Sequence, residues 1–213
     1  RTEHLRAFVQ KGGHLVLTLR TGMKDRYNAL LPIRPPGPLA DLTGVEVEDF
    51  YALDRPIPVT GTLFQGQANL WAERLCLRES ASSVIVLARY GHANHWLDEQ
   101  IALTVNPVAD GLVYMVGAYL DSDSQQKLVD HILSQCRIRP WIAPPGIEIR
   151  TRIRPDGEKV YFVINHALEA RTLSLPFPAF DHLGERRVRA RLELAPYQVA
   201  VLTRYDEGLD HFV

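Results

Sequence analysis

The pattern of hydrophobic and polar positions divides the chain into two regions. Up to about residue 140, segments with a helical period alternate with apolar, β-branched segments that are typical of strands. After the proline-rich stretch Pro140–Gly146 the helical period is lost, and short segments alternate apolar and polar residues as antiparallel strands do. We therefore predict an α/β domain over residues 1–140 and a small all-β antiparallel domain over residues 145–213.

The first region opens with a helix, a glycine turn and a strand. Glu3–Gln10 has its apolar residues on one side of a helix, with Thr2 as its N-cap and Gly12 at its end. His14–Leu19 is almost continuously apolar, which predicts a strand buried on both faces. Because this arrangement is the second half of a βαβ unit, we expect a mostly parallel sheet. Its first strand would precede Thr2, so we interpret the chain as a piece of a longer polypeptide.

The other elements follow from caps, turns and β-branched segments. In the first region, strands are predicted at Val45–Phe50, Ser83–Tyr90, Ile101–Asn106 and Leu112–Val116, and helices at Leu39–Thr43 and Ser122–Cys136. In the second region, strands are predicted at Ile147–Ile153, Lys159–Asn165, Arg171–Leu175, Val188–Leu194 and Gln198–Leu202. In the helix that Asp121 caps, we expect one face to pack on the sheet: Leu128, Val129, Ile132 and Leu133.

Composition and charge exclude several classes of protein. The chain has 46% hydrophobic and 23% charged residues and a formal net charge of −1, as an ordinary globular protein has. This balance favours neither nucleic acid nor a membrane surface as a partner, and no apolar stretch approaches the ~20 residues of a membrane span. The two cysteines, Cys76 and Cys136, suit a reducing compartment, and without a visible targeting signal we expect a cytoplasmic protein.

Two glutamates near tryptophans are the candidates for glycosidase chemistry. Glu73 lies close to Trp71, and Glu99 close to Trp96. A retaining glycosidase needs two carboxylates ~5–5.5 Å apart across a sugar, and tryptophans can stack on sugar rings. The simpler interpretation, which we favour, is that both tryptophans cover core or interface surface and both acids are solvated.

Other candidates for chemistry are weaker. His92 and His95 could ligate zinc, but no third ligand follows at finger spacing, so an ordinary polar turn is favoured. Cys76 stands between leucines, where burial favours packing over nucleophilic attack. The Asn165–His166 pair is better explained as a turn that satisfies backbone groups than as a catalytic base. The sequence contains no nucleophile elbow, P-loop or dinucleotide fingerprint, so we predict no catalytic residue, metal or cofactor in this chain.

Several strings, taken in order, resemble the bacterial β-galactosidases of glycoside hydrolase family 42. The strings that resemble their middle domain are Leu5–Val9, Gly12–Val16, Arg20–Gly22, Pro36–Val45, Leu70–Glu73 and Leu112–Gly117. Those that resemble their small C-terminal β-domain are Pro144–Glu148, Val163–His166 and Leu194–Leu202. One departure is Asn106–Gly111, where relatives usually have a basic, glycine-rich turn, and it puts the geometry of that hairpin in doubt.

The resemblance implies what the chain belongs to and what it lacks. Members of this family carry an N-terminal (β/α)₈ barrel with the catalytic glutamates, then a flavodoxin- or amidotransferase-like domain that mediates trimerisation, then the β-domain. The chain resembles only the second and third parts. The resemblance therefore implies a non-catalytic assembly region of a retaining β-galactosidase, with the barrel of the same polypeptide and further copies of itself, as a homotrimer, as partners.

Two alternatives remain open at this point. An independent amidotransferase-like enzyme would need a cysteine at a strand-to-helix turn near a histidine, which neither Cys76 nor Cys136 offers. A carbohydrate-binding β-module attached to an amidotransferase-like domain would use Tyr161, Phe162 and Tyr197 as stacking residues. Since neighbouring residues of a strand point to opposite faces, Tyr161 or Phe162 must face inward.

Overall fold

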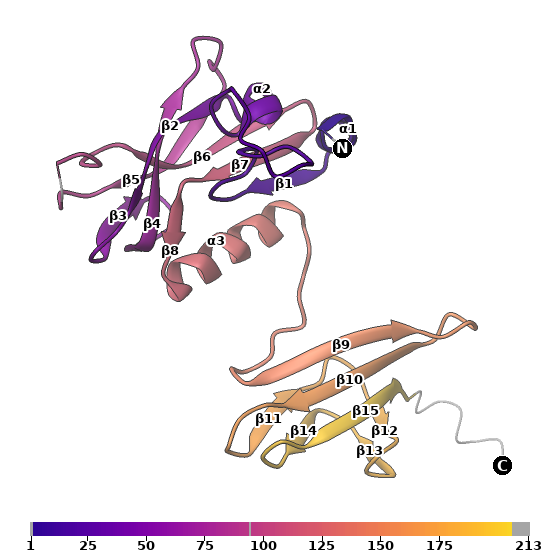
Figure 1. The fold of residues 1–213 in the computed structure, drawn as a ribbon. Coiled ribbons are helices and arrows are strands. Elements are labelled where there is room, and N and C mark those ends of the chain that lie inside the picture. Colours follow the sequence, from indigo (N-terminus) through magenta and orange to yellow (C-terminus); the bar gives the residue numbers. More distant parts are fainter. Residues whose placement is uncertain (1, 94, 206–213) are drawn as a thin grey trace. The chain divides into compact units, whose positions relative to one another are not determined.

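The computed structural model describes residues 2–93 and 95–205 and divides into two compact units (Figure 1). Unit 1 comprises Arg1–Arg139 and unit 2 comprises Pro140–Val213. None of the described helices has the length and apolar character needed to cross a membrane.

Unit 1 is built on one eight-stranded sheet in which β1 and β2 are the edge strands. The strand order is β1-β7-β6-β5-β3-β4-β2, and β8 pairs with β4. The strands span His14–Leu17 (β1), Val45–Ala52 (β2), Ile57–Gly61 (β3), Gln65–Leu77 (β4), Ile85–Tyr90 (β5), Ile101–Val108 (β6), Gly111–Val116 (β7) and Ala118–Leu120 (β8).

The expectation of a mostly parallel sheet is wrong for the described residues. Only β1 and β7 run parallel, and the other pairings of this sheet are antiparallel. The cause is the short connections, because a parallel pair needs a crossover of about a dozen residues or more. Between β6 and β7, for example, Val108 pairs with Gly111, and Ala109 adopts a left-handed φ of 50° in the intervening turn. The segment Asn106–Gly111 therefore forms a hairpin with a tight turn.

Helices lie against both faces of the sheet. The α-helices span Thr2–Gln10 (α1), Ala40–Thr43 (α2) and Ser122–Gln135 (α3), and a 3₁₀ turn spans Gly37–Leu39. Strand β7 sends Val113 and Met115 into a core shared with α1 and α2, and Tyr114 and Val116 into a second core that contains Leu128 of α3. The alternation of β7 therefore builds a helix–sheet–helix arrangement, as expected of a layered fold.

Three strands of unit 1 escaped the sequence pattern: β3, β4 and the three-residue β8. Strand β3 contains Pro58 and ends at Gly61, residues that usually mark turns. Strand β4, which lies next to the edge strand β2, places a charged residue, Glu73, at a buried position next to buried Ala72. A period based on large apolar residues does not detect such a strand, although β4 is the longest of the sheet.

Unit 2 is entirely antiparallel, as predicted. A five-stranded sheet has the order β13-β12-β15-β10-β9, and β11 pairs with β14. The strands span Ile147–Ile153 (β9), Lys159–Asn165 (β10), Arg171–Ser174 (β11), Ala179–Asp181 (β12), Arg186–Val188 (β13), Arg191–Leu194 (β14) and Val199–Arg204 (β15). Of these, the three-residue β12 was missed, and the single strand predicted at Val188–Leu194 is divided into β13, which it touches only at Val188, and β14. Its core includes Val163, Leu173, Leu192 and Leu202, all fully buried.

Candidate functional site

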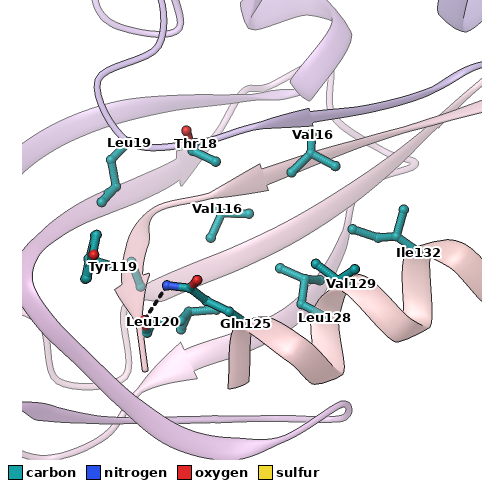
Figure 2. Close-up of a pocket in the computed structure, with 11 residues that line it drawn as sticks. Val16, Thr18, Leu19, Val116, Tyr119, Leu120, Gln125, Leu128, Val129 and Ile132 are labelled. Carbon is teal, nitrogen blue, oxygen red and sulfur yellow. Dashed lines mark hydrogen bonds between the residues drawn. The ribbon is translucent and has the colours of Figure 1, made fainter. Parts of the chain in front are cut away.

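An apolar groove of unit 1 lies between the sheet and α3 (Figure 2). Its volume is about 500 Å³. Val16 lines it from β1, Val116 from β7 and Tyr119 from β8, while Leu128, Val129 and Ile132 line it from α3. The polar groups near its end are occupied, since Gln125 Nε2 donates to the Leu120 carbonyl oxygen over 2.6 Å. An open groove of this composition is suited to apolar contact with protein rather than to chemistry on a polar substrate.

Asp121 fixes the position of α3 beside the sheet. Its carboxylate accepts a hydrogen bond from the Ser124 backbone N–H at 3.0 Å, as an N-cap does, and another from the Gln67 N–H of β4 at 2.6 Å. These bonds favour the ionised form and hold the pKa of Asp121 below its usual value. One side chain thus ties the start of α3 to strand β4.

The packing of α3 is looser than its apolar pattern predicts. Leu128 is buried, Ile132 and Leu133 are half-buried, and Val129 is 47% exposed. The prediction that all four pack on the sheet is therefore wrong for Val129. The reason is geometric, because Val129 forms a wall of the open groove instead of the contact with the sheet. Sequence reasoning found the apolar stripe but could not show that part of it is uncovered.

The edge strand β1 contributes the other wall of the groove. It pairs with β7 on one side, and it is the terminal strand of the sheet on the other. Leu17 is buried, but Val16 is 39% exposed, so the predicted burial on both faces does not hold. An edge strand with exposed apolar side chains presents backbone donors and acceptors to a further strand. The groove and this edge form one continuous surface, which we call the α3–β1 surface.

Glu73 is buried and structural, which corrects the expectation that it is solvated. It is 1% exposed, and its Oε1 accepts a hydrogen bond from the Arg20 backbone N–H at 2.7 Å. Burial is the dominant influence on its carboxyl and raises its pKa. Glu99, by contrast, lies exposed on the loop that follows β5. The carboxylate of Glu73 therefore anchors the loop after β1 within the protein.

The tryptophans near these glutamates have different environments. Trp71 is half-buried and stacks on Phe50, with ring centroids 5.3 Å apart, and the Arg20 guanidinium lies 5.3 Å from its ring. Trp96 is 68% exposed, so of the expected roles, covering core or interface surface, the first is wrong for Trp96 and the second stays a prediction.

The candidate metal and nucleophile positions lie in ordinary surroundings. His92 Nδ1 lies 3.2 Å from Asp98, and His95 is exposed. Among the residues that the structure describes, no group of three or more His, Cys, Asp or Glu could hold a metal ion. Cys76 Sγ donates to the Glu46 carbonyl oxygen at 3.4 Å, and burial raises the pKa of its thiol, the opposite of what a nucleophile needs.

Unit 2 uses its candidate residues for structure. Asn165 is fully buried, and its Nδ2 donates to the carbonyl oxygens of Glu169 and Ala195 over 2.8 Å each. Tyr161 packs inward against Trp141 and Phe177, with ring centroids 5.6 and 5.1 Å away. Tyr197 is 62% exposed and stands in the turn before β15. These residues do not gather into a stacking platform.

Comparison with known proteins explains the two units. Residues 1–139 match the family model of the β-galactosidase trimerisation domain, and residues 146–204 match that of the β-galactosidase C-terminal domain. The chain is 30% identical over 211 residues to the β-galactosidase BglY of Alicyclobacillus acidocaldarius, covering 95% of the chain and 30% of that protein. It is 27% identical over 198 residues to the β-galactosidase LacA of Lactobacillus acidophilus, covering 92% of the chain and 29% of that protein.

Solved structures show the same fold. The β-galactosidase of Bacillus circulans sp. alkalophilus matches with a TM-score of 0.86 at 22% identity, over 96% of this chain and 31% of that one. The cold-adapted β-galactosidase of Rahnella sp. R3 matches with a TM-score of 0.82 at 23% identity, over 95% and 30% of the two chains. The chain thus spans about 30% of the length of the curated relatives it matches. The family resemblance of the sequence is confirmed: the chain belongs to the β-galactosidases of glycoside hydrolase family 42 and corresponds to their trimerisation and C-terminal domains.

Proposed function

We propose that the chain is the non-catalytic C-terminal assembly region of a retaining β-galactosidase, which hydrolyses terminal β-D-galactosides in carbohydrate metabolism. The observation that carries this proposal is the groove of the α3–β1 surface, where the apolar side chains of Val16 and Val129 are open to solvent. Such a surface gains free energy when another protein element covers it. Residues 1–139 match the family model of a trimerisation domain, which supports a role in assembly.

The partners in this proposal are the N-terminal (β/α)₈ barrel of the same polypeptide and two further copies, in a homotrimer. Within unit 1, the helix–turn–strand α1–β1 runs parallel to β7. A strand that preceded α1 in a right-handed βαβ unit would lie parallel to β1 on its open edge. Adding strands there would give the sheet the parallel, flavodoxin- or amidotransferase-like part that we expected. For the two domains we propose the limits that the sequence pattern predicts, 1–140 and 145–213. We also propose a cytoplasmic location, which the two free cysteines suit.

The absence of catalysis by this chain is part of the proposal. Glu73 is buried in the sheet and Glu99 lies on an exposed loop, so neither serves a cleft with a second opposed carboxylate. We expect the purified chain not to hydrolyse a chromogenic β-galactoside. The proposal would be contradicted if the wild-type chain hydrolysed this substrate and if Glu73→Gln or Glu99→Gln abolished that activity.

The assembly role is tested by a pair of charge substitutions on α3. Val129→Glu places a carboxylate in the groove, whereas Ser134→Glu adds the same charge to an exposed position on the other side of the helix. We expect size-exclusion chromatography with light scattering to show self-association of the wild type and of Ser134→Glu, and its loss in Val129→Glu. Equal association of all three proteins would show that the α3–β1 surface is not the contact.

A further inference from the structure

A second cleft of unit 1 lies where the turn between β2 and β3 meets the loop between β5 and β6. Its volume is about 480 Å³. It is lined by Tyr51, Leu53, Asp54, Arg55, Ile57 and Trp96. Unlike the groove beside α3, it combines aromatic rings with an acid and a guanidinium. The proposed assembly role does not involve this cleft.

The aromatic part of the cleft is open to solvent. Trp96 is 68% exposed, and its ring lies edge-on to Tyr51, with centroids 6.2 Å apart and planes at 65°. Tyr51 is itself held, since its hydroxyl donates to Asp49 Oδ2 at 3.1 Å. Both rings therefore border the cleft, and much of the indole remains free of protein contact. An exposed tryptophan beside a cleft offers a large, rigid surface at little cost in side-chain entropy.

The loop that carries Trp96 is fixed from several directions. Asp98 Oδ1 accepts hydrogen bonds from the backbone N–H groups of Ala93 at 2.9 Å and of His95 at 3.1 Å. Arg55 reaches across from the other turn and donates to the Ala93 carbonyl oxygen at 2.9 Å. Leu97, the residue after the exposed tryptophan, is fully buried in the core. The exposure of Trp96 is thus a property of a well-anchored loop.

The same loop holds two residues in an unfavourable backbone conformation. His95 and Glu99 have φ values of 62° and 59°, in the left-handed region that costs non-glycine residues free energy. Conformations of this kind persist where surrounding contacts impose them, as they do at Ala109 in the turn between β6 and β7. Here they flank Trp96 and Leu97, which point outward and inward respectively.

We propose that this cleft binds a pyranoside. A pyranose ring presents C–H groups on its faces and hydroxyls around its rim. The indole of Trp96 would pack against a face, the Asp54 carboxylate would accept from hydroxyls, and the Arg55 guanidinium would donate to them. A volume of about 480 Å³ accommodates one or two sugar residues. The choice of a β-galactoside as the sugar rests on the proposed function.

The test is a titration of the chain with methyl β-D-galactopyranoside, followed by ¹H–¹⁵N NMR. The chain has three tryptophan indole signals, from Trp71, Trp96 and Trp141. We expect the Trp96 signal to shift saturably, with a Kd of about 1 to 10 mM. Trp96→Ala should weaken binding at least about tenfold, while Trp96→Phe should retain part of it. Tyr197→Ala removes an equally exposed aromatic residue of unit 2 and serves as the control that binds like the wild type.

Three results would overturn this inference. The first is no saturable shift up to about 100 mM sugar, and the second is wild-type affinity in a folded Trp96→Ala protein. The third is that Trp96→Ala weakens self-association and leaves sugar binding unchanged. That result would show that Trp96 contacts another protein chain instead of a sugar. Equal affinity for methyl α-D-glucopyranoside would contradict the galactoside assignment. Because the assembly role is measured by self-association of the wild type, either proposal can fail while the other stands.

Discussion

At the scale of single residues, three polar side chains hold loops and a helix of this structure in place. Glu73 closes the loop after β1, Asp121 ties α3 to β4, and Asn165 holds the turn after β10. The sequence singled out all three positions, and it indicated the roles of Asp121 and Asn165. It indicated the wrong role for Glu73, because a glutamate is rarely fully buried and is therefore expected to face water.

The buried carboxyl of Glu73 predicts a pH dependence of stability. Burial raises its folded pKa, so as pH rises above about 4.3 the unfolded chain loses this proton first. Its contribution to the free energy of unfolding is therefore complete below that pH and is lost as pH rises through the folded pKa. Glu73→Gln keeps an acceptor for the Arg20 N–H and cannot ionise.

We expect urea denaturation of Glu73→Gln between about pH 4 and pH 8 to show less loss of stability with rising pH than the wild type. The matched control is Glu99→Gln, which neutralises an exposed carboxylate and should follow the wild-type curve. Parallel curves for Glu73→Gln and the wild type would show that the folded environment does not disfavour the charge.

Asp121 has the opposite dependence. The pKa of Asp121 is lowered in the folded protein. Its contribution to the free energy of unfolding is therefore present above the pKa of the unfolded chain, about 3.9, and is lost as pH falls through the folded pKa. At pH 7, Asp121→Ala should lower the free energy of unfolding by about 1–2 kcal/mol, because the Ser124 and Gln67 amides lose their acceptor. Asp123→Ala removes an exposed acid of the same helical turn and should cost less than about 0.5 kcal/mol. Similar losses in the two variants, measured by urea denaturation, would contradict the capping role.

At the scale of elements, helices and strands with large apolar residues were predictable, whereas their pairing was not. The caps and the period of α3 predicted its limits to within one residue. Strands β3 and β4 were missed because proline, glycine, alanine and a buried glutamate interrupt their patterns. The helix–turn–strand signal predicted a mostly parallel sheet, but among the described strands only the β1–β7 pair is parallel. Pairing depends on contacts between distant segments, which local patterns do not contain.

The uneven burial of α3 predicts uneven costs of truncation. Leu128 is 5% exposed, so Leu128→Ala should lower the free energy of unfolding by about 2–5 kcal/mol. Val129→Ala should cost less than about 1 kcal/mol, because much of Val129 already contacts solvent, and Ile132→Ala should fall between them. Lys127→Ala on the exposed side should be nearly silent. Chemical denaturation gives all four values, and an equal loss for Leu128 and Val129 would mean that α3 docks differently.

At the scale of the whole molecule, the order of short resemblances along the chain predicted its family, which both domain models confirm. Periodicity predicted two regions with different folds. The α3–β1 surface could not be predicted, because an apolar residue on a helix looks the same whether a neighbour covers it or not. The accessible faces of Val16 and Val129 become visible only when the sheet edge and the helix are placed together.

The most direct test of the assembly role is sedimentation velocity of the wild-type chain over a concentration series from about 1 to 100 μM. We predict that the weight-average sedimentation coefficient rises with concentration, since an apolar groove beside an open strand edge favours contact with further copies. The prediction concerns association itself and does not depend on the subunit number that the isolated chain adopts. A clean monomer at every concentration up to about 100 μM would contradict the account.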